Sequence, residues 1–374
     1  MNIDPFILDI ITNPWFIAIA KYVVLFAFIL VWVAYFTLAE RKFAGFIQDR
    51  FGPNRAGPFG MFQPFLDGFK LFTKESFVPA EAVSKILFVA APFVSFTVAL
   101  IVWGAIPFGD AFIFGDVTVS MQLYDPNIGV IFFLAVGSLG LYGIMLSGIA
   151  SNNKYSLMGS VRGAAQMISY ELTLSLALIA VILMSGEATL GGIARQQSET
   201  LLAFGSVKLP GYNVIKYFPF GFFAFVFYII AIYAENGRTP FDLPECENEL
   251  VFGYHTEYSG IKFGLFYLGE YMNMITNSFL ISILFFGGTH VPFFQDAVQS
   301  LPHNIAVLIG IAALIAKAGF FSFLFIWVRW TIPRFRYDTL MNLGWKRLFP
   351  FALANVFVIA VLEVALPLIS AAAK

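Results

Sequence analysis

Eight long apolar segments constrain this chain more than any other feature of its sequence. They lie at residues 15–39, 85–107, 128–150, 164–185, 217–235, 271–288, 304–328 and 348–369. A helix that crosses the hydrocarbon core of a bilayer needs about 20 mostly apolar residues. Only 12% of the residues are charged, whereas soluble domains have about 25%. The sequence therefore predicts an all-α integral membrane protein, in which residues 1–374 form a single membrane domain with eight transmembrane helices.

A shorter segment between the first two spans has a different pattern. In "MFQPFLDGFKLFTKE", residues 61–75, apolar side chains recur at helical spacing and polar side chains take the opposite face. The segment is too short and too polar to cross a bilayer. We expect an amphipathic helix that lies in the membrane interface.

The lysines and arginines are distributed unequally between the two sides of the predicted bundle. Sixteen of the 22 fall on the side of the loops that follow odd-numbered spans, against five on the opposite side. The positive-inside rule then places the odd-numbered loops in the cytoplasm or matrix and both termini on the periplasmic or outer side. The net charge of −1 gives no reason to expect nucleic acid as a partner.

The chain has few residues that could hold a redox centre. Its single cysteine, Cys246, cannot form a disulfide framework, a thiolate metal site or an iron–sulfur cluster within this chain. The histidines, His255, His290 and His303, lie in loops or near span ends, which excludes a haem held between spans. We expect no metal site and no bound cofactor in this chain.

The most unusual polar stretch is "RTPFDLPECENEL", residues 238–250, which gathers four acids: Asp242, Glu245, Glu247 and Glu249. The spacing of Asp242 and Glu245, with a proline between them, predicts a helix start with a capping box that ends at Gly253. Acids could serve there as caps alone, but a cap uses one or two carboxylates. Crowded carboxylates raise one another's pKa and share protons, so we favour a proton-handling role over capping.

A further acid, Glu171, lies inside the apolar segment "RGAAQMISYELTLSLALIA". A carboxylate at membrane depth costs several kcal/mol unless it is neutral or paired, and it marks a candidate functional site. The alternative is a protonated glutamate that bonds to a neighbouring helix.

Two cationic segments flank the first and seventh spans. "ERKFAGFIQDRFGPNRAGPFG" continues from the first span into a turn rich in Gly and Pro, and "VRWTIPRFRYDTLMNLGWKR" alternates arginines with aromatic residues. Each alone is compatible with an ordinary positively charged loop. Together with the interfacial helix they could frame a lateral opening for an amphipathic, lipid-like molecule.

These segments, "GPNRAGPFGMFQPFLDGFKLFTKE", "RGAAQMISYE", "RTPFDLPECENELVFGYHTEYSGIKFGLFYLGEY" and "RFRYDTLMNLGWK", resemble the H subunit of proton-translocating NADH:quinone oxidoreductase, the respiratory complex I family, known in mitochondria as subunit 1. The resemblance implies that the chain forms the membrane entrance and part of a quinone chamber, and couples quinone reduction to proton translocation. It assigns to the entrance and its rim Glu40, Arg41, Phe62, Phe65, Tyr267, Arg329 and Arg334. It assigns to a carboxylate funnel for protons Asp242, Glu245, Glu247, Glu249, Glu257, Glu270 and Glu171.

The resemblance also implies partners and a location. The substrate would be a quinone, ubiquinone or menaquinone, while NADH, FMN and iron–sulfur clusters would belong to partner subunits of the peripheral arm. Small membrane-arm subunits and the lipid bilayer would be further partners. We expect the bacterial inner membrane rather than the mitochondrial inner membrane. Two alternatives stay open: the homologous subunit of a membrane-bound hydrogenase, and a stand-alone proton-coupled transporter.

Overall fold

The computed structural model describes residues 14–114, 117–198, 200–204, 207–292, 294–295, 298 and 300–372. Its long helices are α2 (Pro14–Ile47), α4 (Lys85–Trp103), α5 (Gly129–Ala150), α6 (Lys154–Ser185), α8 (Phe220–Glu235), α10 (Gly260–Phe286), α12 (His303–Thr331) and α14 (Phe349–Ala372). Its short helical elements are η1 (Pro58–Gly60), α3 (Gln63–Thr73), α7 (Leu190–Gln196), α9 (Glu247–Leu250), η2 (Gly253–His255), α13 (Tyr337–Leu343) and η3 (Gly344–Leu348). Two antiparallel hairpins pair β1 (Phe112–Phe114) with β2 (Val117–Val119) and β3 (Thr200–Phe204) with β4 (Val207–Pro210).

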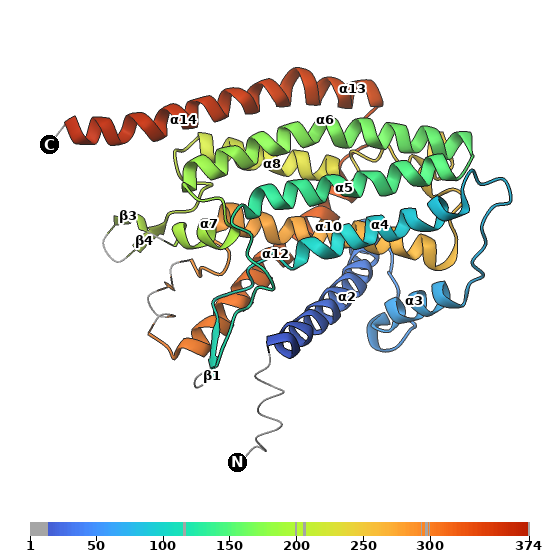
Figure 1. Ribbon diagram of the computed structural model, residues 1–374, viewed down its shortest axis with the longest axis horizontal. Helices are drawn as coiled ribbons and strands as arrows, with labels where there is room; N and C mark the ends of the chain where they lie inside the picture. Colours follow the sequence, from blue (N-terminus) through green and yellow to red (C-terminus); the bar gives the residue numbers. More distant parts are fainter. Residues whose placement is uncertain are drawn as a thin grey trace, which may run out of the picture.

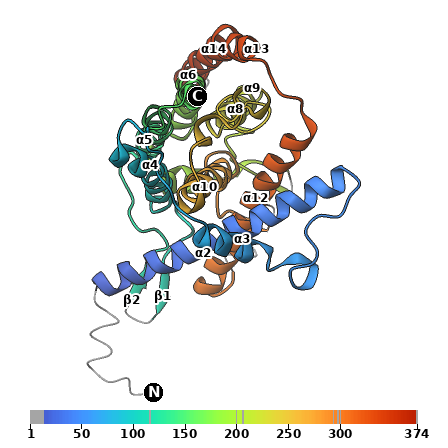
Figure 2. The ribbon, with the colours of Figure 1, turned by 90° about the vertical axis from the view of Figure 1, so that its right-hand side faces the viewer.

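The long helices pack as a bundle with α10 in its middle (Figures 1 and 2). Helix α10 packs against α4 and α12, and α6 packs against α5, α8 and α14. Viewed end-on, α2 crosses the others obliquely at the side of the bundle (Figure 2). Most of α10 is buried by its neighbours, so its polar residues face protein rather than lipid.

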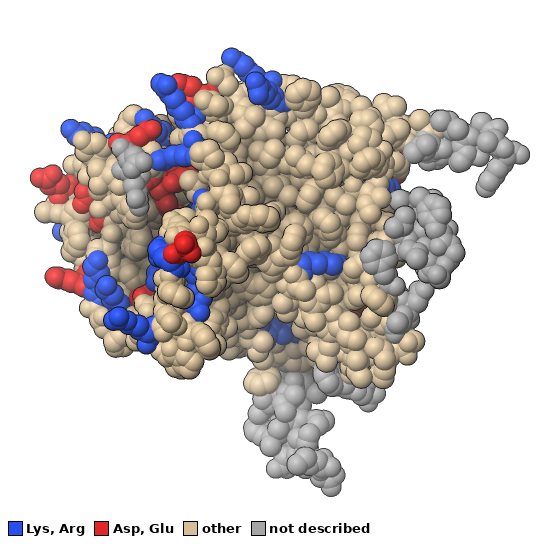
Figure 3. All heavy atoms as spheres, turned by 180° about the vertical axis from the view of Figure 1, so that it is seen from behind, with Lys and Arg blue, Asp and Glu red and all other residues tan. Residues whose placement is uncertain are grey.

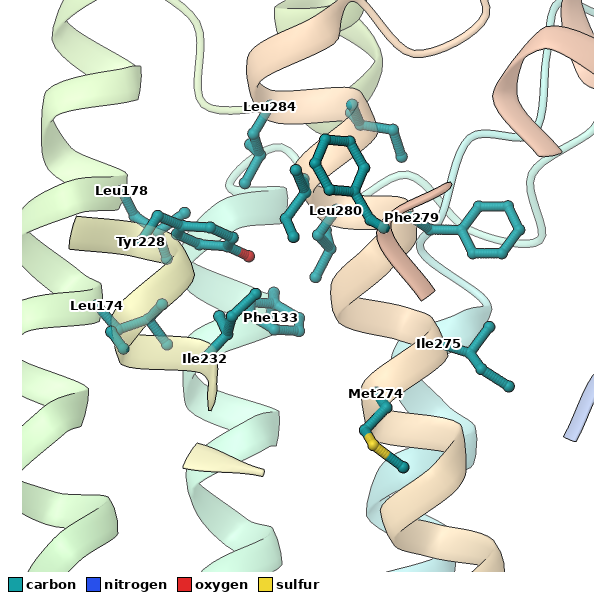
Figure 4. Close-up of a cluster of buried hydrophobic side chains, with 14 of the residues drawn as sticks. Phe133, Leu174, Leu178, Tyr228, Ile232, Met274, Ile275, Phe279, Leu280 and Leu284 are labelled. Atoms are coloured by element: carbon teal, nitrogen blue, oxygen red, sulfur yellow. The ribbon is translucent and has the colours of Figure 1, made fainter. Parts of the chain in front are cut away.

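The apolar core lies between α5, α6, α8 and α10. Leu174 and Leu178 of α6 meet Tyr228 and Ile232 of α8 and Leu280 of α10 in this core (Figure 4), and all five are at most 1% exposed. In a bilayer such helices gain stability from van der Waals packing and interhelical hydrogen bonds rather than from removal of water.

The all-α membrane class is confirmed, because six helices of the described chain are long and apolar enough to cross a bilayer. Helices also stand at the two other predicted spans. Of these, α8 has only 16 residues, and α10 carries Asn, Ser and Thr side chains at buried positions. The count of eight transmembrane helices therefore stays a prediction.

Several helices extend beyond the predicted spans, and this changes the surroundings of candidate residues. Helix α2 continues to Ile47 rather than ending near residue 39, α6 begins at Lys154 rather than 164, and α10 begins at Gly260 rather than 271. Glu40, Tyr267 and Glu270 are therefore helical. A helix can continue past the end of an apolar run when its polar side chains find partners or water. The end of the apolar run therefore does not mark the end of the helix.

A helix, α3, lies within the segment that is predicted to form the amphipathic helix, and none of its residues is buried; its amphipathic role stays a prediction. Its phenylalanines, Phe65, Phe69 and Phe72, are more than half exposed. An ion pair of 2.5 Å between Arg41 and Asp67 joins α3 to α2. These exposed rings fit a membrane surface, and the interfacial placement of α3 stays a prediction.

Charged side chains gather at one end of the molecule (Figure 3), the end where α3 and α13 lie in Figure 1. Most of the remaining surface in this view is neither acidic nor basic. This distribution agrees with the unequal lysine and arginine content of the loops.

Candidate functional site

The acidic stretch does not form the helix that its spacing predicts. Helix α9 begins at Glu247 after Cys246, which makes no side-chain cap hydrogen bond, so the predicted capping box at Asp242 and the helix end at Gly253 are wrong. Tertiary contacts hold the segment in an irregular path. Arg334 donates a hydrogen bond to the Asp242 carbonyl oxygen, and Gly253, with φ of +55°, lies so close to the Pro244 carbonyl that a Cβ would collide with it.

Four charged side chains and a tyrosine form what we call the buried ion cluster: Arg238, Glu245, Tyr254, His255 and Glu270. Arg238 Nη2 lies 2.7 Å from Glu270 Oε2, and its Nη1 lies 3.9 Å from Glu245 Oε2. His255 Nε2 lies 3.2 Å from Glu245 Oε1 and 3.4 Å from Glu270 Oε1. The Tyr254 hydroxyl donates to Glu270. Each carboxylate therefore faces both cationic residues.

The partners of His255 and Glu245 determine their charge. Burial lowers the pKa of His255, but hydrogen bonds to Glu245 and Glu270 outweigh burial and raise it to about 9. Burial raises the pKa of Glu245, but Arg238 and His255 outweigh burial and hold it well below its usual range. Two cations thus face two carboxylates near neutral pH. Such a neutral arrangement tolerates burial, whereas an unpaired charge would not.

Asp242 lies beside this cluster and titrates in a different range. Burial, reinforced by the Glu245 charge, raises the pKa of Asp242 to about 7. Its Oδ1 is buried and accepts no hydrogen bond from the described chain. Asp242 can therefore gain or lose a proton near neutral pH.

A cavity of about 60 Å³ extends from the cluster to side chains of α5, α6 and α8. Glu245 and Glu270 line one part of it, and Glu235 and Glu171 line another. On this measure a water molecule needs about 10–15 Å³, so the cavity has room for a few. Ser138 of α5 donates a hydrogen bond to Glu171. The lining of this one cavity thus includes four carboxylates.

The other predicted acids lie elsewhere. Glu249 forms a surface ion pair of 2.6 Å with Arg162. Glu257 accepts a hydrogen bond of 2.7 Å from Asn153 and lines a separate open pocket. The side chain of Glu247 lies outside the part of the structure that is described. The described acids of the predicted funnel are therefore divided among separate surroundings.

Another open pocket, of about 590 Å³, lies between α2, α10 and α12. Its lining includes Glu40, Arg41, Tyr267, Tyr271 and Arg329. Glu40 is 6% exposed and accepts hydrogen bonds from Tyr271 and Arg329. The Tyr267 and Tyr271 hydroxyl oxygens are 2.8 Å apart. We call this the entrance pocket, after the role predicted for these residues; its lining combines aromatic rings with a cation, Arg329, that is paired with Glu40.

Arg238 joins the two sites. Its guanidinium carbon lies 5.0 Å from the ring centroid of Tyr271 and 5.7 Å from that of Tyr267, a geometry of attraction between a cation and an aromatic face. The same guanidinium pairs with Glu270. Arg238 therefore contacts both the pocket tyrosines and the ion cluster.

The remaining predicted entrance residues lie outside this pocket. Phe65 lies on α3 and Phe62 directly before it, and they are 52% and 57% exposed. The ring centroids of Phe65 and Tyr35 are 6.3 Å apart. Arg334 holds the Asp242 carbonyl instead of lining the pocket.

Sequence reasoning did not assign Arg238, His255 or Tyr271 to a site. Arg238 lies in the quoted acidic stretch, which offered a signal for it. His255 gave no such signal, because only the fold brings it to Glu245. Glu245, His255 and Glu270 have ligand atoms within 4.8 Å of one another, but Arg238 already pairs with these carboxylates and would repel a metal cation.

Comparison with known proteins gives one consistent family. Residues 20–360 match the family model described as NADH dehydrogenase. The NADH-quinone oxidoreductase H subunit of Leptospira biflexa is 50% identical over 341 residues, covering 89% of this chain and 91% of that protein. The proteins of the same name from Flavobacterium johnsoniae and Magnetococcus marinus are 47% and 45% identical, covering 90% and 91% of this chain and 92% and 90% of theirs.

Proposed function

Because this chain belongs to the family of the NADH-quinone oxidoreductase H subunit, we propose that its entrance pocket admits quinone and that its ion cluster couples quinone reduction to proton movement. As a subunit of this enzyme it works together with other complex I subunits. The observation that carries the proposal is the position of Arg238, which contacts both the pocket tyrosines and Glu270.

Reduction of a quinone to a quinol takes up two electrons and two protons. In this proposal the electrons come from an iron–sulfur cluster of a partner subunit, and NADH and FMN also bind to partner subunits. This chain supplies the walls of the path by which quinone enters from the bilayer. The exposed phenylalanines of α3 support a lateral opening beside this helix.

Negative charge on the quinone head group attracts the Arg238 guanidinium and weakens its hold on Glu270. A carboxylate that loses its cation has a higher proton affinity, so the ion cluster takes up a proton. The cavity that Glu270, Glu235 and Glu171 line has room for a few water molecules and then offers a path for the proton. In this way a redox event becomes a movement of charge.

The entrance can be tested separately from the electron-transfer centres. We expect Arg41→Ala and Arg329→Ala to reduce quinone reductase activity while NADH oxidation by a soluble artificial acceptor persists, because that acceptor does not use the pocket. Arg329→Ala is expected to have the larger effect, since it leaves the buried Glu40 without its cation. Equal loss of both activities would indicate failed assembly. Unchanged activities would contradict the proposal that quinone enters through this pocket.

We further propose that all eight predicted spans cross the inner membrane of a bacterium, with both termini on the periplasmic side. The unequal distribution of lysine and arginine supports this orientation. A fluorescent protein that folds only in the cytoplasm, fused after Lys374, is expected to stay dark in the inserted protein. Bright fluorescence would show that the number of spans or the orientation is wrong.

A further inference from the structure

Gln166, a fully buried residue of α6, binds two separate points of the chain. Its side-chain nitrogen donates a hydrogen bond of 2.6 Å to the Ala234 carbonyl oxygen and one of 2.7 Å to the Phe241 carbonyl oxygen. These carbonyls lie at the two ends of segment 235–240, which carries Glu235 and Arg238. A single side chain thus fixes both ends of the segment.

The two carbonyl groups differ in their other partners. The Ala234 carbonyl lies in the last turn of α8 and also accepts a backbone hydrogen bond of 3.3 Å from the Gly237 N–H, so Gln166 is an additional donor there. Phe241 lies in an irregular, buried path, where no regular ladder of hydrogen bonds is available. Loss of the donor to a buried carbonyl is costly, so loss of Gln166 would free the Phe241 end of the segment first and favour another path for it.

The same face of α6 supports the rest of the acidic stretch. Gly159 packs against Gly253, and Gly163 packs against the Pro244 ring; a Cβ at either position would lie about 3 Å from these groups, at 2.8 and 3.1 Å. Gln166 continues this face at helical spacing. Glu171 lies five residues further along the same helix, so α6 fixes the acidic loop relative to the cavity carboxylate.

We propose that Gln166 is a positioning residue for proton coupling: it holds segment 235–240 so that Arg238 stays on Glu270 and Glu235 stays at the cavity. This inference rests on the proposed function. Gln166 contacts neither the entrance pocket nor the quinone path, so it acts through the residues that it holds.

The test is Gln166→Met, which keeps the length of the side chain and removes both donors. We expect the turnover of quinone reduction to fall about tenfold in the assembled complex, since misplacement of a reacting group by about 1 Å can cost up to 100-fold. The KM for quinone should change little. The acid limb of the pH–rate profile should move to higher pH, because a displaced Arg238 no longer stabilises the Glu245 carboxylate. Hydrogen exchange of backbone amides in residues 234–241 should increase.

Tyr170→Phe is the matched control. Tyr170 lies one turn further along α6, is fully buried, and donates to the Leu340 carbonyl oxygen at 2.9 Å. Its loss removes a comparable hydrogen bond from α6 to a different segment, so turnover and pH profile should stay near wild type. If Gln166→Met does not assemble, Gln166→Glu serves instead, because its protonated form offers one donor and should give an intermediate loss.

Two results would overturn the inference. One is a wild-type turnover and pH profile in the assembled Gln166→Met complex. The other is an equal effect in Tyr170→Phe, which would indicate general loosening of α6. If Arg238→Met and Glu171→Gln lose activity but Gln166→Met does not, the positioning role of Gln166 is wrong and the proposed function still holds. Full activity in all of these variants would remove the proposed function.

Discussion

Arg238→Met is expected to abolish most quinone reductase activity in the assembled complex. The variant leaves Glu245 and Glu270 buried with only His255 as a cation, where the wild type has two. Removal of one partner from a buried ion pair costs about 3–5 kcal/mol, and each 1.36 kcal/mol that reaches the reaction barrier is a factor of about ten in rate. A loss of about 100-fold or more is therefore expected, measured as quinone reduction normalised to assembled complex.

Arg162→Met provides the control, because Arg162 also pairs with a carboxylate of the acidic stretch, Glu249. That pair is exposed, with 29% and 54% of the two side chains accessible. Exposed pairs contribute at most about 1 kcal/mol, so Arg162→Met should keep most of its activity. If Arg238→Met behaves like Arg162→Met, the guanidinium does not couple the entrance pocket to the ion cluster.

The pH dependence gives a second check on the same residue. Arg238 and His255 hold the pKa of Glu245 below its usual range, so Glu245 stays ionised in the wild type until the pH is acidic. Without Arg238 the pKa of Glu245 rises. The acid limb of the pH–rate profile should then move to higher pH in Arg238→Met and stay in place in Arg162→Met.

The positions of the helices followed from the sequence because apolarity over about 20 residues is a local property. Their ends did not, because these depend on partners that are distant in sequence. Glu40 remains in α2 because Arg329 and Tyr271 satisfy its carboxylate. No pattern around residue 40 could predict a partner that is 289 positions away.

The acidic stretch shows the same limit. The spacing of Asp242 and Glu245 is typical of a helix start, but Gln166 and Arg334 engage the backbone at Phe241 and Asp242. These tertiary hydrogen bonds outweigh a capping preference of about 1 kcal/mol. The proton-handling role inferred from the gathering of acids therefore stays a prediction, whereas the local structure predicted from their spacing was wrong.

His255 could not be assigned from the sequence at all. Isolated histidines in loops are ordinary, and nothing in "GYHTEYSG" indicates contact with a carboxylate. The contact arises because η2 packs on α6, where Gly159 lets the backbone at Gly253 approach. Packing of this kind is set by the whole fold, so ion clusters built across several elements are the part of a site that sequence patterns predict least.

Glu171→Gln is expected to separate assembly from proton movement most clearly. The substitution keeps the size of the side chain and its ability to accept a hydrogen bond from Ser138, so the complex should assemble. Four acids of the described chain line the cavity. Glu171 is the one that is most distant in sequence from the acidic stretch, and the substitution removes its ionisable group. Loss of a positioned proton-transfer group slows a reaction by about 10²–10⁴-fold, so proton uptake into membrane vesicles driven by quinone reduction should fall by at least about 100-fold.

Glu363→Gln is the matched control for Glu171→Gln. Glu363 is also a carboxylate within a long helix, α14, and it accepts a hydrogen bond from the Tyr217 hydroxyl, but it does not line the cavity. If a carboxylate at membrane depth serves only packing, both variants should behave alike. If the cavity carries protons, Glu171→Gln should lose proton uptake while Glu363→Gln keeps it. Wild-type proton uptake in an assembled Glu171→Gln complex would show that this cavity is not the path.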